Sequence, residues 1–428
     1  LDKSIIIDVL ANDELPDWEN VKITSVSTPT NGEVILNDNK TVTYIPEGAL
    51  NTSNATPTEP ESIPETESTS EPEATPEPEE ESVEDTFTYT TEVTNDDNTV
   101  TVEEATVTVT VTNTSIATSG ENVYYVTVNG NSNNDGKTEN SAWNWSHAVN
   151  QATAGDIIHV KAGRYENYMV TFNQNGTESQ PIRFIGYKNT PGDIDANLQQ
   201  LQSEDTKGRR GSTMYANNVA YDYTTQPSSS EMPFFSKSYV IDDLAMLING
   251  DNIELNNFII DGYSNGIFLS NSADGCSIKN IVFNEQGNLN VHSTDQGHPD
   301  RYKGEGIRNY ASNTKIEFCS FRNVEQQALT FLGCKNGEVT NNIVYSYNPV
   351  GGTDYCFLIS SDNGEPSSGL VFDYNTTHRE TNVSHGGHGF IVKNGAQNNI
   401  FKHFKVINSS VEASFGSSNN NIFQDGEI

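Results

Sequence analysis

The first quarter of the chain alternates apolar and polar residues in short runs separated by turn residues. The runs are SIIIDVL, VKITSVS, GEVILND, KTVTYIP, DTFTYTTEV and EATVTVTVT, all within residues 1–113. A period of two places every second side chain on the same face of a strand, as in a sheet with one buried face. The pattern therefore predicts a β-sandwich over residues 1–113.

From residue 249 onward, short apolar strands recur at near-regular intervals. Their first apolar residues are Ile253, Ile278, Ile316, Val339, Leu370, Ile400 and Ile422, and the shortest intervals are 22–25 residues. Asn recurs near the strand ends, as expected for side chains stacked at the turns of a solenoid (Asn257, Asn280, Asn323, Asn342 and Asn408). Each unit can bury its apolar face only against its neighbours. The pattern predicts a parallel β-helix with rungs over residues 249–428.

Each rung has a second strand, and the longer rungs carry their extra residues just before it. The second strands are 266–271, 306–311, 328–333, 356–361, 389–394 and 413–418, and the extra residues are 285–305, 345–354 and 375–388. Insertions at one corner of a solenoid form a wall along one face. Alternation predicts two inward columns (Ile267, Ile307, Leu329, Phe357, Phe390, and Leu269, Asn309, Phe331, Ile359, Val392). It also predicts two outward columns (Phe268, Arg308, Thr330, Leu358, Ile391, and Ser270, Tyr310, Leu332, Ser360, Lys393).

Three segments follow neither pattern. Residues 51–84 are rich in Glu and Pro and contain no Lys or Arg, which predicts a disordered loop because so little apolar surface can be buried there. Residues 114–121 are a linker. Residues 194–248 predict a loop insertion lying over the coil, in which Arg209 and Arg210 either reach the same face as the wall or have no chemical role.

The composition limits the partners of the protein. A formal net charge of −36 and a pI near 4.3 repel nucleic acid and anionic membranes. No run of eighteen apolar residues is present, so we expect no membrane insertion. The β-rich composition predicts a secreted or cell-surface protein, and ends within strand patterns predict neighbouring domains of a longer chain. Cys276, Cys319, Cys334 and Cys356 match no zinc spacing, which predicts buried free thiols rather than one disulfide.

Basic residues gather in two segments of this acidic chain. Between residues 377 and 405 lie four Lys or Arg (Arg379, Lys393, Lys402, Lys405), one acid (Glu380) and four of the eight His. The insertion 285–305 adds His292, His298, Arg301 and Lys303. Local charge reversal predicts a site for an acidic polysaccharide, with these four residues, His385 and Arg379 as substrate-binding candidates. The alternative is a set of scattered, solvated bases.

Two regions resemble known families. The stretches DVLAND, ITSVSTPTNGEV, TVTYIP and DTFTY resemble bacterial cadherin-like or immunoglobulin-like repeats. Residues 122–167 resemble the N-terminal cap of right-handed parallel β-helix proteins, which include several polysaccharide lyases, and imply such a domain over residues 122–428. At the edge of the first domain, Asp8, Asn12, Asp13 and Asp17 are either Ca²⁺ ligands or turn-forming residues.

The stretch HGFIVK at 388–393 resembles part of a pectate-lyase family with a β-helix fold, where Asp-Gly-Phe leads to the catalytic Lys. The resemblance implies that Lys393 is the base that removes the proton α to a uronate carboxylate. His388 stands where that family has Asp, and no Asp cluster for a catalytic Ca²⁺ is apparent. His388, His385 or Arg308 would then neutralise the carboxylate, and Tyr310 or a His would protonate the leaving oxygen.

Two other functions remain open. A glycoside hydrolase needs two carboxylates, for which Glu305, Asp354 and Asp362 are candidates, and GGHG at Gly386–Gly389 is similar to the Gly-His-Gly of polygalacturonases. A non-catalytic adhesin or stalk segment would display sugar-binding aromatics near the wall (Tyr302, Tyr310, Tyr345, Tyr347 and Tyr355). Lyase activity is the leading hypothesis.

Overall fold

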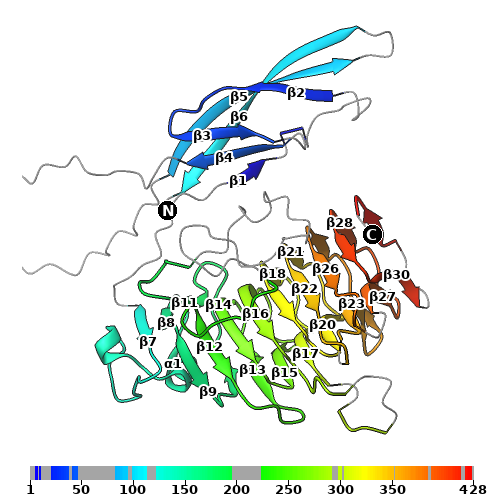
Figure 1. Ribbon diagram of the computed structural model, residues 1–428. Helices are drawn as coiled ribbons and strands as arrows, with labels where there is room; N and C mark the ends of the chain where they lie inside the picture. Colours follow the sequence, from blue (N-terminus) through cyan, green and yellow to red (C-terminus); the bar gives the residue numbers. More distant parts are fainter. Residues whose placement is uncertain are drawn as a thin grey trace, which may run out of the picture. The chain divides into compact units, whose positions relative to one another are not determined.

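A computed structural model describes residues 5–7, 9–10, 21–37, 41–46, 82–94, 99–112, 122–194, 223–291, 297–300, 303–350, 352–383, 387–415 and 420–426. The chain divides into two compact units, Leu1–Ser115 and Ile116–Ile428 (Figure 1). Within the described ranges, helical structure is limited to α1 (Trp145–Gln151) and a single 3₁₀ turn, η2 (Glu139–Ser141). The protein is therefore an all-β protein.

The first unit contains two antiparallel sheets. Their strand orders are β1 (Ile5–Ile7), β4 (Val42–Pro46), β3 (Gly32–Leu36) and β2 (Val21–Val26), β5 (Ser82–Thr94), β6 (Val100–Thr112). Buried side chains from both sheets form one core (Val9, Leu10, Val21, Ile23, Val42, Tyr44, Phe87, Tyr89 and Val109). The predicted sandwich is confirmed. Because β5 begins at Ser82, the predicted loop 51–84 is too long at its end, and its remaining residues lie outside the described ranges.

The second unit is a coil with three faces, which we call A, B and C. Face A contains β7 (Val123–Val126), β8 (Ile157–Lys161), β11 (Ile182–Tyr187), the first halves of β14 (Ile253–Asp261) and β16 (Ser277–Asn284), β18 (Lys315–Glu317), β21 (Glu338–Thr340), β25 (Val371–Asp373), β28 (Ile400–Lys402) and β31 (Ile422–Gln424). Face B contains β9 (Gly163–Glu166), β12 (Pro233–Ser236), the second halves of β14 and β16, β19 (Ser320–Arg322), β22 (Ile343–Ser346), β26 (Thr376–Arg379) and β29 (Lys405–Ile407).

Face C contains β10 (Val170–Phe172), β13 (Leu244–Ile248), β15 (Asn265–Leu269), β17 (Glu305–Asn309), β20 (Gln327–Leu332), β23 (Tyr355–Asp362), β27 (His388–Lys393) and β30 (Ser410–Phe415). Neighbouring strands on each face pair in parallel, and among the described residues of this unit only the short β24 (Glu365–Pro366) pairs antiparallel, with β23. Figure 1 shows these rows of strands stacked from β7 to β31. The predicted right-handed parallel β-helix is confirmed.

A single residue in the left-handed region turns the chain from face A to face B. Asn257, Asn280 and Asn341 occupy this position with φ of 68°, 52° and 59°. Asn tolerates this conformation better than most residues because its short side chain forms local hydrogen bonds. The amide of Asn280 donates to Asn257 Oδ1 at 2.9 Å, and Asn342 donates to Asn375 at 3.0 Å in a second stack. The expected stacking is therefore confirmed for Asn257 and Asn280 and present at Asn342, whereas Asn323 and Asn408 bond to backbone groups.

The interior of the coil is closed at its N-terminal end by Trp145 on α1. Its ring is fully buried and lies 4.8–6.0 Å from the rings of Phe172, Phe184, Phe235 and Phe258. Asn144 caps the helix by accepting a hydrogen bond from the His147 N–H. This helix is short, and its packing rather than its length holds it in place.

The segment 194–248, expected to be one insertion, contains two strands of the coil. β12 pairs with β9 and β14, and β13 pairs with β10 and β15, so regular rungs begin before residue 249. The prediction was wrong here because the insertion falls inside a rung, between β11 and β12, and hides the rung spacing. Arg209 and Arg210 lie outside the described ranges.

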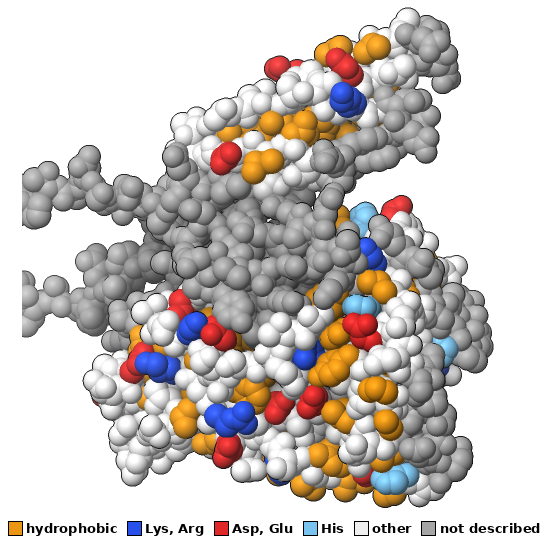
Figure 2. Space-filling model, in the orientation of Figure 1, with side chains coloured by type: hydrophobic (Ala, Val, Ile, Leu, Met, Phe, Trp, Pro, Cys, Tyr) orange, Lys and Arg blue, Asp and Glu red, His pale blue; other side chains and the backbone are white. Residues whose placement is uncertain are grey.

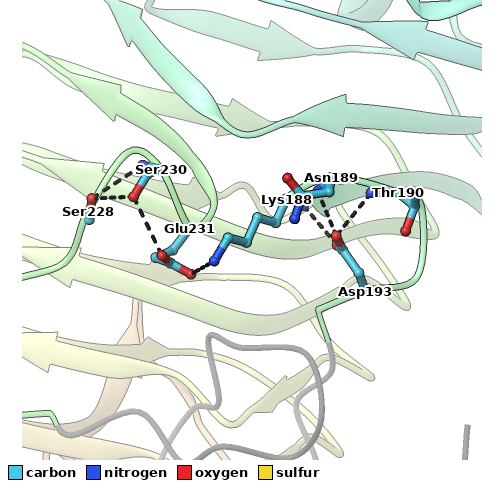
Figure 3. A network of polar contacts seen from close by, with 7 residues as sticks. All are labelled: Lys188, Asn189, Thr190, Asp193, Ser228, Ser230 and Glu231. Carbon is cyan, nitrogen blue, oxygen red and sulfur yellow. Dashed lines mark hydrogen bonds and ion pairs between the residues drawn. The ribbon is translucent and has the colours of Figure 1, made fainter.

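The two ends of this insertion are tied together (Figure 3). Lys188 Nζ lies 2.8 Å from Glu231 Oε2, and the Asp193 carboxylate accepts hydrogen bonds from the Asn189 and Thr190 N–H groups at 2.6 and 3.0 Å. Ser230 also donates to Glu231 at 3.5 Å. The ion pair fixes where the insertion leaves and rejoins the coil.

The four cysteines are buried free thiols, as predicted. Burial raises the pKa of the Cys276, Cys319, Cys334 and Cys356 thiols to about 12, so they act as small apolar side chains. No helix among the described residues is long and apolar enough to span a membrane.

Candidate functional site

The register of face C confirms both inward columns and the first outward column, whereas the second outward column pairs only at Leu332 and Ser360. Ile267, Ile307, Leu329, Phe357 and Phe390 pair in sequence, and so do Phe268, Arg308, Thr330, Leu358 and Ile391. The last rung differs, because Phe390 pairs with Val411 and the register shifts on both sides of it. The predicted strand 413–418 was therefore placed about one half-strand too late.

A further column lies at the start of the face C strands. It contains Asn265, Glu305, Gln327, Tyr355 and His388, which pair in turn. These side chains reach along the outer surface toward the next outward residue: Thr330 Oγ1 donates to Gln327 Oε1 at 2.7 Å, and Glu305 pairs with Arg308. Thr330, Leu358 and Ile391 are at most 4% exposed although their register points them outward. Asn265 and Glu305 are buried as well, whereas Gln327, Tyr355 and His388 are partly exposed. The outer surface is thus formed by the strand-start side chains of the later rungs and by the bases.

Lys393 ends β27 and belongs to the first of two cation clusters on this surface. Its ammonium lies 4.9 Å from the centroid of the Tyr355 ring, a cation–π distance. The Tyr355 ring stacks on His388 of the next strand, with centroids 5.4 Å apart and planes at 20°. Burial lowers the pKa of the Lys393 amine, and no carboxylate among the described residues forms an ion pair with it. A half-buried amine of this kind can act as a base.

Arg308 on β17 belongs to the second cluster. Its Nη2 pairs with Glu305 Oε1, and its guanidinium lies 4.9 Å from the centroid of the Phe268 ring. Burial raises the pKa of the Glu305 carboxyl, although the charge of Arg308 opposes this shift. Burial also lowers the pKa of Arg308, but Glu305 and the Tyr310 hydroxyl outweigh it and leave that pKa raised. Arg308 is therefore a permanent cation that cannot act as a base, and 32% of its side chain stays exposed to contact an anion.

The two clusters are separated along the coil. The strand order β17, β20, β23, β27 places three spacings between Tyr310 or Arg308 and Lys393. Parallel strands lie about 4.8 Å apart, so the separation along the axis is about 14 Å. One sugar ring cannot contact both clusters. The structure brings together Lys393, His388 and Tyr355, and it places Arg308 and Tyr310 elsewhere on the same face.

The remaining substrate-binding candidates do not form one site. Lys303 pairs with Asp242, and His298 Nδ1 accepts a hydrogen bond from the Asp300 N–H at 3.2 Å. Arg379 is 3% exposed, and its Nη2 donates to the Thr353 carbonyl below the loop backbone. Burial lowers the pKa of Arg379. Arg379 is therefore a structural side chain and does not belong to a surface that a polymer could contact. The other candidates lie outside the described ranges (His292, Arg301 and His385).

The bases of residues 377–405 do not form one patch. His378 lies on face B, where its Nδ1 is 3.1 Å from the Tyr223 hydroxyl. Lys402 and His403 both contact Asp373, at 3.2 and 2.8 Å, near the corner between faces A and B. Figure 2 shows a face on which Lys and Arg side chains lie singly, several of them beside acids. The strands of one rung lie on three different faces of the coil. Closeness in sequence therefore does not show which bases share a face.

The suggested Ca²⁺ ligands Asp8, Asn12, Asp13 and Asp17 lie outside the described ranges. Among the residues that are described, no group of three or more His, Cys, Asp or Glu is placed to hold a metal ion. The Ca²⁺ site therefore stays a prediction.

Tyr355 was not expected beside Lys393, although the sequence contains a signal for it. Tyr355-Cys356-Phe357 and His388-Gly389-Phe390 are equivalent segments of consecutive rungs. The second strands were aligned from Cys356 and Gly389 onward, one residue too late to include the stacked pair. Starting that alignment one residue earlier pairs Tyr355 with His388 and so predicts the stacked rings.

Known proteins resemble this chain only in part. No known protein family matches the chain. A segment of 71 residues is 35% identical to pectate lyase L of Dickeya chrysanthemi and 34% identical to pectate lyase L of Dickeya dadantii (strain 3937). The segment is 15% of this chain, and the chain spans 17% of the length of each relative.

Solved structures of three lyases also resemble the chain. A pectate lyase is 14% identical with a TM-score of 0.38, covering 69% of this chain and 79% of its own. A rhamnogalacturonan lyase is 10% identical with a TM-score of 0.39, covering 70% and 87%, and an alginate lyase from Paenibacillus sp. is 13% identical with a TM-score of 0.38, covering 66% and 96%. The fold assignment rests on the strand register described above.

Proposed function

We propose that this protein is a lyase that cleaves a uronate-containing polysaccharide by β-elimination. The observation that carries the proposal is Lys393, a half-buried amine whose pKa is lowered and which no carboxylate of the described residues neutralises. The segment that resembles pectate lyase L adds support for a uronate polymer as substrate. Elimination needs a base of this kind next to a uronate C5–H.

The cluster supplies groups for each step. Neutral Lys393 Nζ removes the C5 proton, the electron pair of that bond forms the C4–C5 double bond, and the C4–O bond to the leaving sugar breaks. The Tyr355 hydroxyl donates its proton to the leaving oxygen, and a ring N–H of His388 donates a hydrogen bond to the substrate carboxylate. Stacking with His388 and the cation–π contact with Lys393 hold the Tyr355 ring in place.

The test is the ultraviolet absorbance of the unsaturated uronate product. The protein would be mixed with polygalacturonate, alginate and glycosaminoglycans, with and without Ca²⁺. A rising signal that Lys393→Ala abolishes supports the proposal, and Tyr355→Phe separates the loss of the hydroxyl from the loss of the ring. No signal on any of these polymers would overturn lyase activity toward them. New reducing ends without the absorbance would indicate a hydrolase.

The alternative function is a surface adhesin that binds glycans without cleaving them. It is favoured by the pairing of Arg308 with Glu305 and of Lys303 with Asp242, which leaves little net positive charge on this side of the coil. Retention of the protein on glycans without product formation would support it.

We also propose a context for the enzyme. The protein acts outside the cell, its N-terminal sandwich is a cadherin-like or immunoglobulin-like repeat, and Ca²⁺ binds at the edge of that repeat. A rise of the thermal midpoint of the sandwich on addition of Ca²⁺, lost in Asp13→Ala, would support the metal site. An unchanged midpoint would contradict it.

A further inference from the structure

Arg308 and Tyr310 lie on the same outer face as Lys393 but too far away to share its chemistry. The two clusters are joined by the strands β17, β20, β23 and β27, and about 14 Å separates their rungs. The columns of outward residues run along this direction. A 1,4-linked pyranose chain advances by close to one strand spacing per sugar, so a chain lying along face C would place about one sugar on each rung.

The Arg308 guanidinium is held in a fixed orientation. Glu305 accepts a hydrogen bond from Nη2, the Phe268 ring supports the guanidinium plane at 4.9 Å, and the Tyr310 hydroxyl contacts it. The Glu305 side chain is 3% exposed, whereas 32% of the Arg308 side chain stays accessible. The carboxylate is therefore under the surface and the cation is at the surface, ready to receive a second carboxylate.

Resting on the proposed function, we infer that Arg308 and Tyr310 form a distal subsite for a uronate carboxylate, about three sugars from the bond that Lys393 cleaves. A short oligomer bound across Lys393 does not reach this subsite, and a longer one does. The subsite adds binding energy that depends on chain length and takes no part in proton transfer. It makes the enzyme select polymers and long oligomers over short ones.

The test compares trimeric and hexameric galacturonate oligomers as substrates. We expect Arg308→Gln to raise KM for the hexamer about tenfold, the value of one charge-assisted hydrogen bond, with kcat unchanged and the trimer unaffected. Arg308→Gln leaves the Glu305 carboxylate buried without its charged partner. The double variant Glu305→Gln/Arg308→Gln has no such unpaired carboxylate, and its KM for the hexamer should rise by the same factor. Lys315→Gln, which removes a cation paired with Glu338 on face A, is the matched control.

Equal effects on trimer and hexamer, or none on either while wild-type activity persists, would overturn the subsite and leave the lyase proposal standing. If wild type does not cleave galacturonate oligomers and binding to Lys393→Ala does not grow with their length, the subsite proposal falls. The lyase proposal falls with it only if alginate and glycosaminoglycans also give no absorbance signal. Binding of the hexamer by Lys393→Ala, weakened about tenfold by adding Arg308→Gln, would support the subsite independently of turnover.

Discussion

Arg308 and Lys393 occupy similar places on face C, yet their surroundings give them opposite chemistry. Arg308 follows a buried carboxylate three residues earlier and keeps a raised pKa, whereas Lys393 follows a histidine and a glycine and has a lowered pKa. The first position of the strand is Glu305 in one rung and His388 in the other, and the Lys393 ammonium contacts the Tyr355 ring of the neighbouring rung. The Glu305 carboxylate raises the pKa of a guanidinium that is already a permanent cation, whereas burial lowers the pKa of the Lys393 amine. The comparison assigns binding to Arg308 and reactivity to Lys393.

The largest effect is expected for Lys393→Ala. Loss of a general base typically lowers a rate about a hundredfold to ten-thousandfold, and we expect lyase activity to fall by that amount. Initial rates of unsaturated-uronate formation measure it. Lys402→Ala, which removes a lysine paired with Asp373, is the control and should retain its activity. Unchanged activity in Lys393→Ala would contradict the assignment of the base.

The next effect concerns stability. We expect Arg308→Met to lower the free energy of unfolding by about 3 kcal/mol, because it leaves the Glu305 carboxylate buried without a charged partner. Urea unfolding of the coil measures this loss, and Glu305→Gln in the same chain should restore part of it. Wild-type stability in Arg308→Met would show that the pair does not hold this part of face C.

The pH dependence of activity also distinguishes Lys393 from Arg308. Only the neutral amine of Lys393 accepts a proton, so kcat/KM should rise about tenfold per pH unit up to its pKa and then level off. Since burial lowers that pKa below the ordinary value of 10.5, the plateau should begin at a lower pH than for a solvated lysine. A profile of kcat/KM against pH measures it. If the rise of kcat/KM with pH persists unchanged in Lys393→Ala, the titrating group is another residue.

The smallest effect is expected for Lys393→Met on stability. The native protein holds the Lys393 proton less tightly than the unfolded chain, so burial opposes folding below the native pKa, and this penalty disappears as the pH rises through the ordinary value of 10.5. Methionine removes the penalty. We expect the free energy of unfolding at neutral pH to stay equal or rise by less than about 1 kcal/mol. A clear loss in urea unfolding would reveal a structural role for the ammonium.

Much of the coil could be predicted from the sequence because its rungs repeat locally. The pairing of Arg308 with Thr330 and of Thr330 with Leu358 follows from aligning short strands with a period of two. The rung that contains β12 and β13 was missed, since an insertion inside it breaks the spacing. The prediction of β30 about three residues too late has a different cause, because alternation does not reveal a register shift.

By itself, the sequence determined the all-β architecture, the sandwich, the stacked rungs, the columns of face C and the buried state of the cysteines. These follow from periodic burial, which is a property of neighbouring residues. The contacts between rungs come from the tertiary structure alone: Lys393 meets Tyr355, whose ring stacks on His388, and Arg379 lies beneath a loop. Each turn of the coil carries adjacent residues to different faces and brings together residues more than twenty positions apart. Burial and charge pairing, and hence pKa, therefore depend on contacts between rungs that one-dimensional spacing does not contain.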